Sequence, residues 1–197
     1  MSNTVIAISR QYGSGDRQIG QHLSEVLGIP FYDKEIIRQA ALNSGIDECH
    51  FSGADQRGAG SPLYSANPGV PFELPLSDKL YLAQHTALRQ LAVNGACVIV
   101  GRGACGILKG IVPLLSVFLY ADLPVRKKRI VEEYGEPSDN LEKKIRDTDK
   151  KRMAYYTFYE PAKQLWTEHF DLCIDSGRFG IAGTVSLILG AYGSVGA

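Results

Sequence analysis

A short stretch near the start of the chain, ISRQYGSGDRQIG, carries residue types that bind phosphate through the backbone. Gly13 and Gly15 allow the close or left-handed backbone that a phosphate-binding loop needs, and Ser14 adds a hydroxyl donor. An apolar run precedes this turn, and helical spacing follows it from Gln18. A strand, a glycine turn and a helix N-terminus together present N–H groups to an anion. The spacing therefore predicts a phosphate-binding loop, although glycine also serves simply to turn the chain between a strand and a helix.

The charges in this loop differ from the usual phosphate-binding pattern, G-x-x-x-x-G-K-[ST]. With the pattern aligned on Gly15, Arg10 stands at the first glycine and Asp16 stands at the lysine. We expect Arg10 and Arg17 to supply the missing positive charge, because a guanidinium pairs two phosphate oxygens with its planar fork. Two interpretations are open for Asp16. It helps to hold Mg²⁺, or it faces solvent in the first helical turn, where acids are favoured, and the second is preferred.

Two further clusters of arginine have spacings that suit an anion. Arg126 and Arg129 lie in the run RKKR, and the segment IRDTDKKR contains Arg146 and Arg152. On a helix, Asp149 shares one broad face with Arg146 and Arg152, so its carboxylate can orient both. For an isolated charge run, a solvated helix face is the commoner explanation. We expect the lysines between these arginines to lie on such a surface.

Five short apolar runs alternate with helical patterns and predict a parallel sheet that is covered on both faces. They span residues 5–9, 30–33, 97–101, 114–121 and 170–175. In such sheets ligands bind beyond the carboxyl ends of the strands, so the residues after each strand are candidates. Asp33 ends one of these runs and Arg102 follows another, where it lies between Gly101 and Gly103, an unusual place for a surface charge. A helix cap is the alternative role for Asp33.

Composition sets the broad class of the protein. The chain has 197 residues, of which 45% are apolar and 21% charged, as in a single globular domain. Its 21 basic and 21 acidic residues balance, which argues against a broad nucleic-acid surface. No apolar run approaches the roughly 18 residues that span a membrane, and no signal peptide is evident, so we expect a cytoplasmic protein. The four cysteines show no C-x-x-C pair, which favours reduced thiols.

In order and spacing, these stretches resemble the nucleoside monophosphate kinases, and specifically the divergent cytidylate kinase-like branch of the P-loop kinases. The resemblance extends over nearly the whole chain and rests on ISRQYGSGDRQIGQHLSEVLGIPFYD, VIVGRGACGIL, VFLYADLPVRKKRI, IRDTDKKRMAYY and DLCIDSGRFGIAGTVSLIL. It implies a three-layer α/β P-loop kinase fold with a five-stranded parallel sheet and helices on both faces. A single domain over 1–197 would divide into a core of residues 1–51, 78–138 and 170–197, a mobile acceptor-side insert at about 52–77, and a lid at about 139–169.

The resemblance also implies an activity, the transfer of a phosphoryl group from ATP, with Mg²⁺, to a nucleoside monophosphate, with a CMP-like acceptor favoured. The catalytic residues would be Arg17, Arg146 and Arg152, with Asp149 orienting the lid. The ATP-binding residues would be Arg10, Gly13, Ser14, Gly15, Asp16, Gln18, Arg126 and Arg129. The acceptor-binding residues would be Asp33, Arg38, Gly101 and Arg102. No metal ligand is assigned.

Two alternatives stay open because the chain departs from the family pattern. Its loop has no lysine, and Gly103 stands where cytidylate kinases carry an acid after the Gly-Arg of the third strand. One alternative is a nucleotide-binding or sensing domain without turnover, and the other is a kinase for a different small acceptor. In each case the expected partners are small molecules, rather than DNA, RNA or a membrane.

Overall fold

The fold is that of a computed structural model, which describes residues 3–33, 76–159 and 169–195. The described strands are β1 (Val5–Arg10), β2 (Phe31–Tyr32), β3 (Val98–Val100), β4 (Leu114–Tyr120) and β5 (Leu172–Asp175). The described helices are α1 (Asp16–Leu27), α4 (Leu76–Val93), α5 (Ala104–Leu108), α6 (Leu123–Glu132), α7 (Leu141–Tyr159) and α8 (Ser176–Tyr192). Arg38 and nearly all of the predicted insert lie outside the described residues.

The five strands form one parallel sheet in the order β2-β3-β1-β4-β5, as the alternation of strand and helix patterns predicted. The central strand β1 pairs with β3 on one side, where Ile6 is opposite Val98, and with β4 on the other. All five carboxyl ends therefore meet at one edge of the sheet. The loop that follows β1 lies in the middle of that edge.

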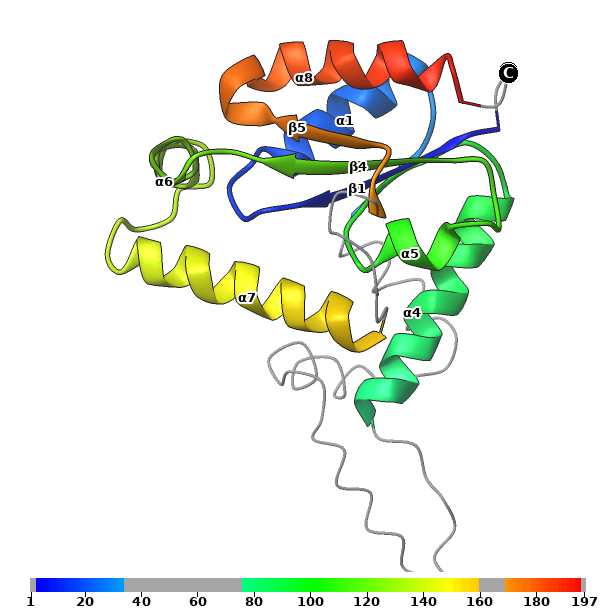
Figure 1. The fold of residues 1–197 in the computed structure, drawn as a ribbon, viewed down its shortest axis with the longest axis horizontal. Helices are drawn as coiled ribbons and strands as arrows, with labels where there is room; N and C mark the ends of the chain where they lie inside the picture. Colours follow the sequence, from blue (N-terminus) through cyan, green and yellow to red (C-terminus); the bar gives the residue numbers. More distant parts are fainter. Residues whose placement is uncertain (1–2, 34–75, 160–168, 196–197) are drawn as a thin grey trace, which may run out of the picture.

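Helices cover both faces of the sheet, so the fold has three layers (Figure 1). α1 and α8 lie on one face, and α4, α5 and α7 lie on the other. Along β1, Ile6 and Ile8 belong to the core that includes residues of α1 and α8, whereas Val5 and Ala7 belong to the core beneath α4 and α5. All four side chains are fully buried. This explains why the strand reads as a continuous apolar run rather than as an alternating one.

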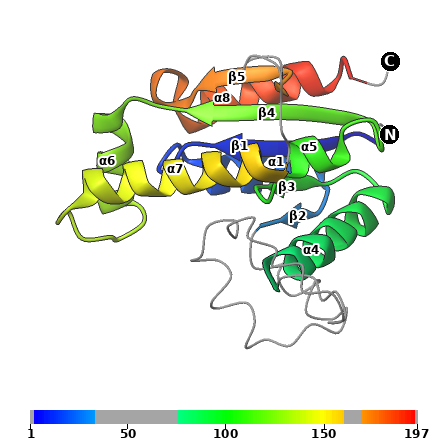
Figure 2. The same cartoon turned by 60° about the horizontal axis from the view of Figure 1, so that its bottom comes forward.

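Helix α7 extends alongside β1 from α6 to α5 (Figure 2). A small apolar cluster of Ile130, Leu141 and Ile145 packs α6 against α7, and Tyr12 from the loop after β1 contacts this cluster. The packing places one face of α7 over the end of the central strand.

Two elements differ from the sequence prediction. The short helix α5 was not predicted, because its five residues ACGIL are too few to show a period. Gly180 has φ +66° and ψ 179° inside α8, so the helix is kinked there, and no pattern in the sequence predicted that kink. Within the described residues, no helix combines the length and the apolar character that crossing a membrane requires.

Candidate active site

The loop between β1 and α1 has the backbone of an anion cradle. Gly13 and Gly15 both have φ +83°, a left-handed conformation that favours glycine. The Ser14 hydroxyl donates to the carbonyl of Gln11 at 2.9 Å and closes the turn. Gly15 is the N-cap of α1 and has no side chain to cap it, so the first N–H groups of the helix face the loop without such a partner. Those groups and the helix dipole favour a negative charge at this position.

Two arginines of α6 contact backbone carbonyls of the loop after β1. Arg126 Nη1 lies 3.3 Å from the carbonyl of Tyr12, and Arg129 Nη1 donates to the carbonyl of Gly13 at 3.1 Å. Both side chains are buried, whereas Lys128 of the same run is exposed. The arginines were predicted to contact the donor nucleotide. In the structure both guanidiniums contact the backbone of the loop and so help to determine its shape. Each also has an acidic partner, Asp149 for Arg126 and Glu133 for Arg129.

Asp149 of α7 also binds the loop, through a backbone N–H group. Its Oδ1 accepts the backbone N–H of Tyr12 at 2.7 Å, and its Oδ2 accepts from Arg126 Nη1 at 2.6 Å. The sequence predicted that Asp149 orients Arg146 and Arg152. Arg146 lies differently from that prediction, since its side chain is 72% exposed and pairs with Glu142 at 2.7 Å. Asp149 instead ties α7 to the loop after β1.

The position of the missing lysine is occupied by an ion pair. Arg10 Nε donates to Asp16 Oδ2 at 2.7 Å, and the two side chains are only 14% and 15% exposed. The preferred expectation that Asp16 faces solvent is therefore wrong, because a nearby cation draws the carboxylate inward. Burial is the largest influence and would lower the pKa of Arg10. The attraction and hydrogen bond of Asp16, together with Tyr156 and Cys105, outweigh it and raise that pKa above its ordinary value.

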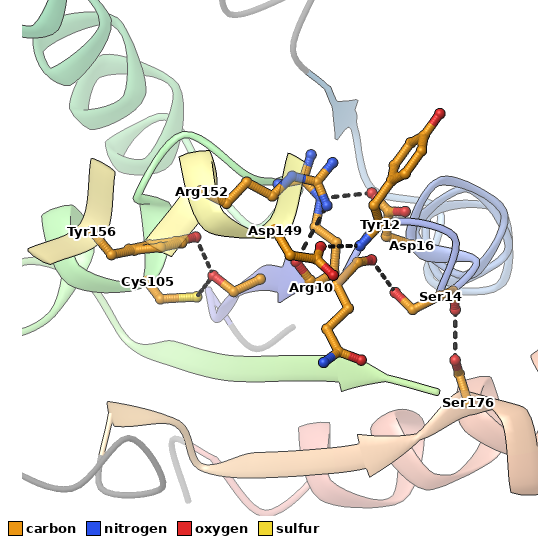
Figure 3. Close-up of polar contacts among 11 residues, drawn as sticks. Arg10, Tyr12, Ser14, Asp16, Cys105, Asp149, Arg152, Tyr156 and Ser176 are labelled. Atoms are coloured by element: carbon orange, nitrogen blue, oxygen red, sulfur yellow. Dashed lines mark hydrogen bonds and ion pairs between the residues drawn. The ribbon is translucent and has the colours of Figure 1, made fainter. Parts of the chain in front are cut away.

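Arg152 of α7 adds a second cation beside this pair (Figure 3). Its Nη1 lies 3.3 Å from the carbonyl of Arg10, and its guanidinium lies over the ring of Tyr12, 5.6 Å from the ring centre. Burial, and next the charge of Arg10, lower the pKa of Arg152 to about 10. The side chain remains charged at neutral pH. The guanidiniums of Arg10 and Arg152 and the carboxylate of Asp16 thus lie together at the carboxyl end of β1, which we call the mouth of β1.

Arg17 points away from this cluster. Its side chain is 69% exposed, and Nη2 lies 3.5 Å from Oδ2 of Asp33, which follows β2. The predicted place of Arg17 beside the donor phosphates therefore differs from its place in the structure. Gln18, also predicted to bind phosphate, has a buried Oε1 that accepts no hydrogen bond from the described residues. Among the arginines that the sequence analysis proposed, those at the mouth of β1 are Arg10 and Arg152.

The residues after β3 form an unusual turn on the β2 side of the loop. Gly101, Arg102 and Gly103 have φ values of +89°, +56° and +70°, three left-handed residues in succession. A non-glycine residue in this region is uncommon and strains the backbone. The partly buried Arg102 is therefore held at the carboxyl edge of the sheet by its two glycines. Asp33, Arg17 and Arg102 all belong to this half of the edge.

A second contact of α7 was not predicted from the sequence. The Tyr156 hydroxyl lies 2.6 Å from the Ser9 hydroxyl, and Cys105 Sγ of α5 lies 3.4 Å from the same oxygen (Figure 3). These residues are far apart in the chain and have no common motif, so no pattern in the sequence links them. The contact joins α7 to β1 and α5 beneath the arginines.

The described residues contain no group of three or more histidine, cysteine or acidic side chains that could hold a metal ion. Magnesium differs from metals that need such a cage, because it often binds through substrate phosphates, waters and one or two carboxylates. The donor set therefore fits Mg²⁺ that arrives with a nucleotide, and it does not form a dedicated metal site.

Comparison with known sequences gives a family. Residues 5–178 match the model of the cytidylate kinase-like family. A cytidylate kinase of Methanothrix thermoacetophila is 25% identical over 188 residues, which cover 95% of this chain and 96% of that protein. A cytidylate kinase of Archaeoglobus fulgidus is 28% identical over 189 residues, which cover 94% and 93%.

Comparison with solved structures gives the fold. A crystal structure of an uncharacterized protein from Eubacterium ventriosum has a TM-score of 0.74 at 24% identity, and covers 97% of this chain and 99% of its own. Shikimate kinase from Acinetobacter baumannii, in complex with shikimate, has a TM-score of 0.56 at 18% identity, and covers 98% and 94%. These similarities establish the three-layer P-loop kinase fold.

Proposed function

Because this chain belongs to the cytidylate kinase-like family, we propose that it transfers the γ-phosphoryl group of ATP to a nucleoside monophosphate, with a CMP-like acceptor favoured. Phosphoryl transfer by a P-loop kinase is the activity that the family and the curated relatives support. The choice of CMP rests on the names of the two relatives, which are cytidylate kinases. ATP and the acceptor are its proposed small-molecule partners.

The observation that carries this proposal is the loop after β1. Its two glycines are left-handed, the start of α1 has no side-chain cap, and Arg126, Arg129 and Asp149 hold the shape of the loop. A loop whose only role was to turn the chain would not need buried arginines on its carbonyls. We assign the phosphates of ATP to this cradle, where the N–H groups and the helix dipole attract them.

Charge at the reacting phosphate would come from the lid helix. Phosphoryl transfer needs little covalent help from the protein, and depends on alignment and on neutralising the transferred group. Arg152 is the lid residue whose guanidinium lies over the loop, through its contacts with Arg10 and Tyr12. Mg²⁺, when bound with ATP, would neutralise further phosphate charge. We therefore assign Arg152 a catalytic role and give Arg146 none.

The acceptor would bind on the β2 side of the loop. Arg102 would pair the monophosphate, and Asp33 would accept from the cytosine amine or a sugar hydroxyl, with Arg17 positioned beside Asp33. Arg38 keeps its acceptor assignment from the sequence. An oxygen of the acceptor phosphate attacks the γ-phosphorus of ATP, the bond from that phosphorus to the β-phosphate oxygen breaks, and ADP leaves. The products are ADP and a nucleoside diphosphate.

The test is an ADP-release assay with MgATP and a panel of acceptors. The panel contains CMP, dCMP, UMP, AMP and GMP, with shikimate as a non-nucleotide acceptor suggested by a structural neighbour. We expect release with CMP at least about tenfold above any other acceptor, a preference of roughly 1.4 kcal/mol. Preference for another acceptor would overturn the CMP assignment. MgATP binding without ADP release on any acceptor would support the non-catalytic alternative.

A further inference from the structure

The site where P-loop kinases carry a lysine holds a carboxylate in this chain, and a cation reaches the same place from another position. The usual lysine contacts the β- and γ-phosphates from the residue after the last loop glycine. Here that residue is Asp16, and it pairs with Arg10, which stands at the first glycine of the pattern. The cation therefore stands at position 10, at the start of the loop, and its acidic partner stands at position 16, where the lysine would be.

The ion pair leaves part of the arginine available to an anion. Asp16 accepts from Nε, and among the described residues no further hydrogen bond engages the two Nη groups of Arg10. A guanidinium has five N–H donors in a planar fork and can pair a carboxylate and a phosphate at once. Asp16 therefore fixes the orientation of the fork without using all of its donors.

Gly101 makes room for the arginine. A Cβ built on Gly101 would lie 2.2 Å from Nη1 of Arg10 and 2.9 Å from Cζ. Any side chain at position 101 would therefore displace the guanidinium from its place. This connects the turn after β3, on the proposed acceptor side, to the loop that is proposed to bind the donor.

The charges of the cluster sum to that of one lysine. Arg10 and Arg152 are positive and Asp16 is negative, which gives these three residues a net charge of one. Asp149 also attracts Arg152, but its charge is balanced by its partner Arg126. Two neighbouring guanidiniums repel each other, and this repulsion contributes to the lowered pKa of Arg152. A polyphosphate placed between them would remove that repulsion. The cluster is thus arranged for an anion that carries several charges.

We propose that Arg10 replaces the P-loop lysine and contacts the β- and γ-phosphates of ATP, with Asp16 as the residue that positions it and Gly101 as the residue that admits it. The inference rests on the proposed function and deepens it by naming how the lysine-free loop binds its donor. It accounts for a carboxylate that would otherwise repel the triphosphate.

Exchanging the two positions provides the central test. Arg10→Gln and Asp16→Lys should each lower kcat by at least about 100-fold, which is the usual scale for removing a charge-stabilising group. The double variant Arg10→Gly with Asp16→Lys rebuilds the ordinary loop, and should recover kcat to within tenfold of the parent. Loss of kcat in the single variants without recovery in the double variant would overturn the proposal. So would a single variant with parental kcat and parental MgATP affinity.

Gly101→Ala tests the contact with Arg10, with Gly110→Ala as its matched control. Both glycines have positive φ, +89° and +75°, but a Cβ at Gly110 meets no atom within 4 Å. Both variants should lose similar stability from backbone strain. Only Gly101→Ala should lose kcat and MgATP affinity, by tenfold or more. In an Arg10→Gln background this extra loss should disappear, whereas an undiminished loss would overturn the role of Gly101.

The parent protein separates this inference from the proposed function. Isothermal titration with MgATP and the ADP-release assay are both run on the unsubstituted chain first. Absence of both signals contradicts the proposed function, and the inference fails with it. Binding and turnover in the parent, with Arg10→Gln within threefold of it in both, contradict the inference alone. The acceptor KM should stay within threefold in Arg10→Gln and Asp16→Asn. Their thermal unfolding should match that of the parent, because a general loss of folding would by itself lower the apparent kcat.

Discussion

At the scale of single residues, the position of each arginine distinguishes those that lie over the loop from those on the surface. Arg152 lies over the loop and Arg17 lies beside Asp33, although sequence spacing placed both near the donor phosphates. The distinction matters because a guanidinium stabilises a transition state only where charge develops.

Removing the charge of Arg152 should cost far more activity than removing that of its neighbour. We expect Arg152→Gln to lower kcat by about 100- to 1,000-fold, the range found when a single stabilising donor is lost. Lys151→Gln removes one charge from an exposed position on the same helix and should change kcat less than threefold. Steady-state ADP release, with thermal unfolding of both variants, measures this. Equal effects of the two substitutions would contradict the catalytic role.

The pH dependence of the reaction rate should reveal the titration of Arg152. The pKa of Arg152 is lowered to about 10, so the guanidinium is charged below that pH and loses its proton above it. Because the charged form is required, kcat/KM for MgATP should be level toward pH 9 and fall above pH 10. Bound phosphate favours the charged form, so the fall in kcat should occur at higher pH. In Arg152→Gln this limb should be absent, and its persistence there would assign it to another group.

Arg17 should influence the acceptor and not the donor. Its contact with Asp33 at 3.5 Å is near the end of β2, so Arg17→Ala should raise the acceptor KM about tenfold, as the loss of one charged hydrogen bond would. The KM for MgATP should change less than twofold. Lys128→Ala, a similarly exposed cation on α6, is the control. A larger effect on the MgATP KM would return Arg17 to the donor side.

The positions of some of these charged side chains could be predicted from the sequence. Arg126 and Arg129 are three residues apart, so they share a helix face, and the lysines between them were correctly placed on the surface. The sequence could not reveal which way that face pointed, because this depends on the packing of α6 against the loop. The inward turn of Asp16 was missed for a similar reason. A preference for acids at a helix start gives no direction, and the partner Arg10 comes from the end of a strand.

At the scale of elements, α7 serves as a clamp on the loop. Its Asp149 joins the N–H of Tyr12 and the guanidinium of Arg126, and its Tyr156 contacts Ser9. The helix therefore adds to stability as well as carrying Arg152. This differs from a lid that touches the core only when substrate binds.

Asp149→Asn should measure the strength of this clamp. The substitution removes the partner of a buried arginine, and we expect unfolding free energy to fall by about 2 kcal/mol, within the range for charged hydrogen bonds. Asp147→Asn, an exposed acid on the same helix, should change it by less than 0.5 kcal/mol, about the usual limit for surface substitutions. Urea unfolding at neutral pH compares the two. Equal stability of both variants would show that Asp149 does not hold the loop.

The strands were more predictable than the helices. β1 and β4 are buried on both faces, so their apolar runs marked them, and the structure confirmed them within one residue at each end. The kink of α8 at Gly180 was hidden because glycine also occurs within regular helices. The ties between α7, β1 and α5 join side chains about 100 residues apart or more, and local periodicity carries no information about them.

At the scale of the whole molecule, the strand order separates two proposed sites. β2 and β3 lie on one side of β1, and β4 and β5 lie on the other. The acceptor residues belong to the first half of the edge, while α6, which follows β4, supports the loop from the second. Donor and acceptor would therefore bind beside each other rather than in one shared pocket.

Thermal unfolding with both substrates tests this separation. MgATP at about 100 times its Kd should stabilise the protein by about 2.7 kcal/mol, and for this chain length that raises Tm by roughly 5–10 °C. CMP at the same multiple of its Kd should give a similar rise, and the two together should give about the sum. Adding a non-hydrolysable ATP analogue in place of ATP prevents turnover during the scan. A combined rise no larger than either alone would mean that the ligands compete for one site.

The bond between Ser176 and the carbonyl of Ser14 spans 162 residues, and it has a consequence for the order in which the protein matures. Synthesis proceeds from the N-terminus, so the loop is made well before the turn after β5. The cradle sequence thus leaves the ribosome long before the residues that hold it in shape. A nascent chain would carry the complete glycine turn yet remain unable to capture nucleotide until the final strand had joined the sheet.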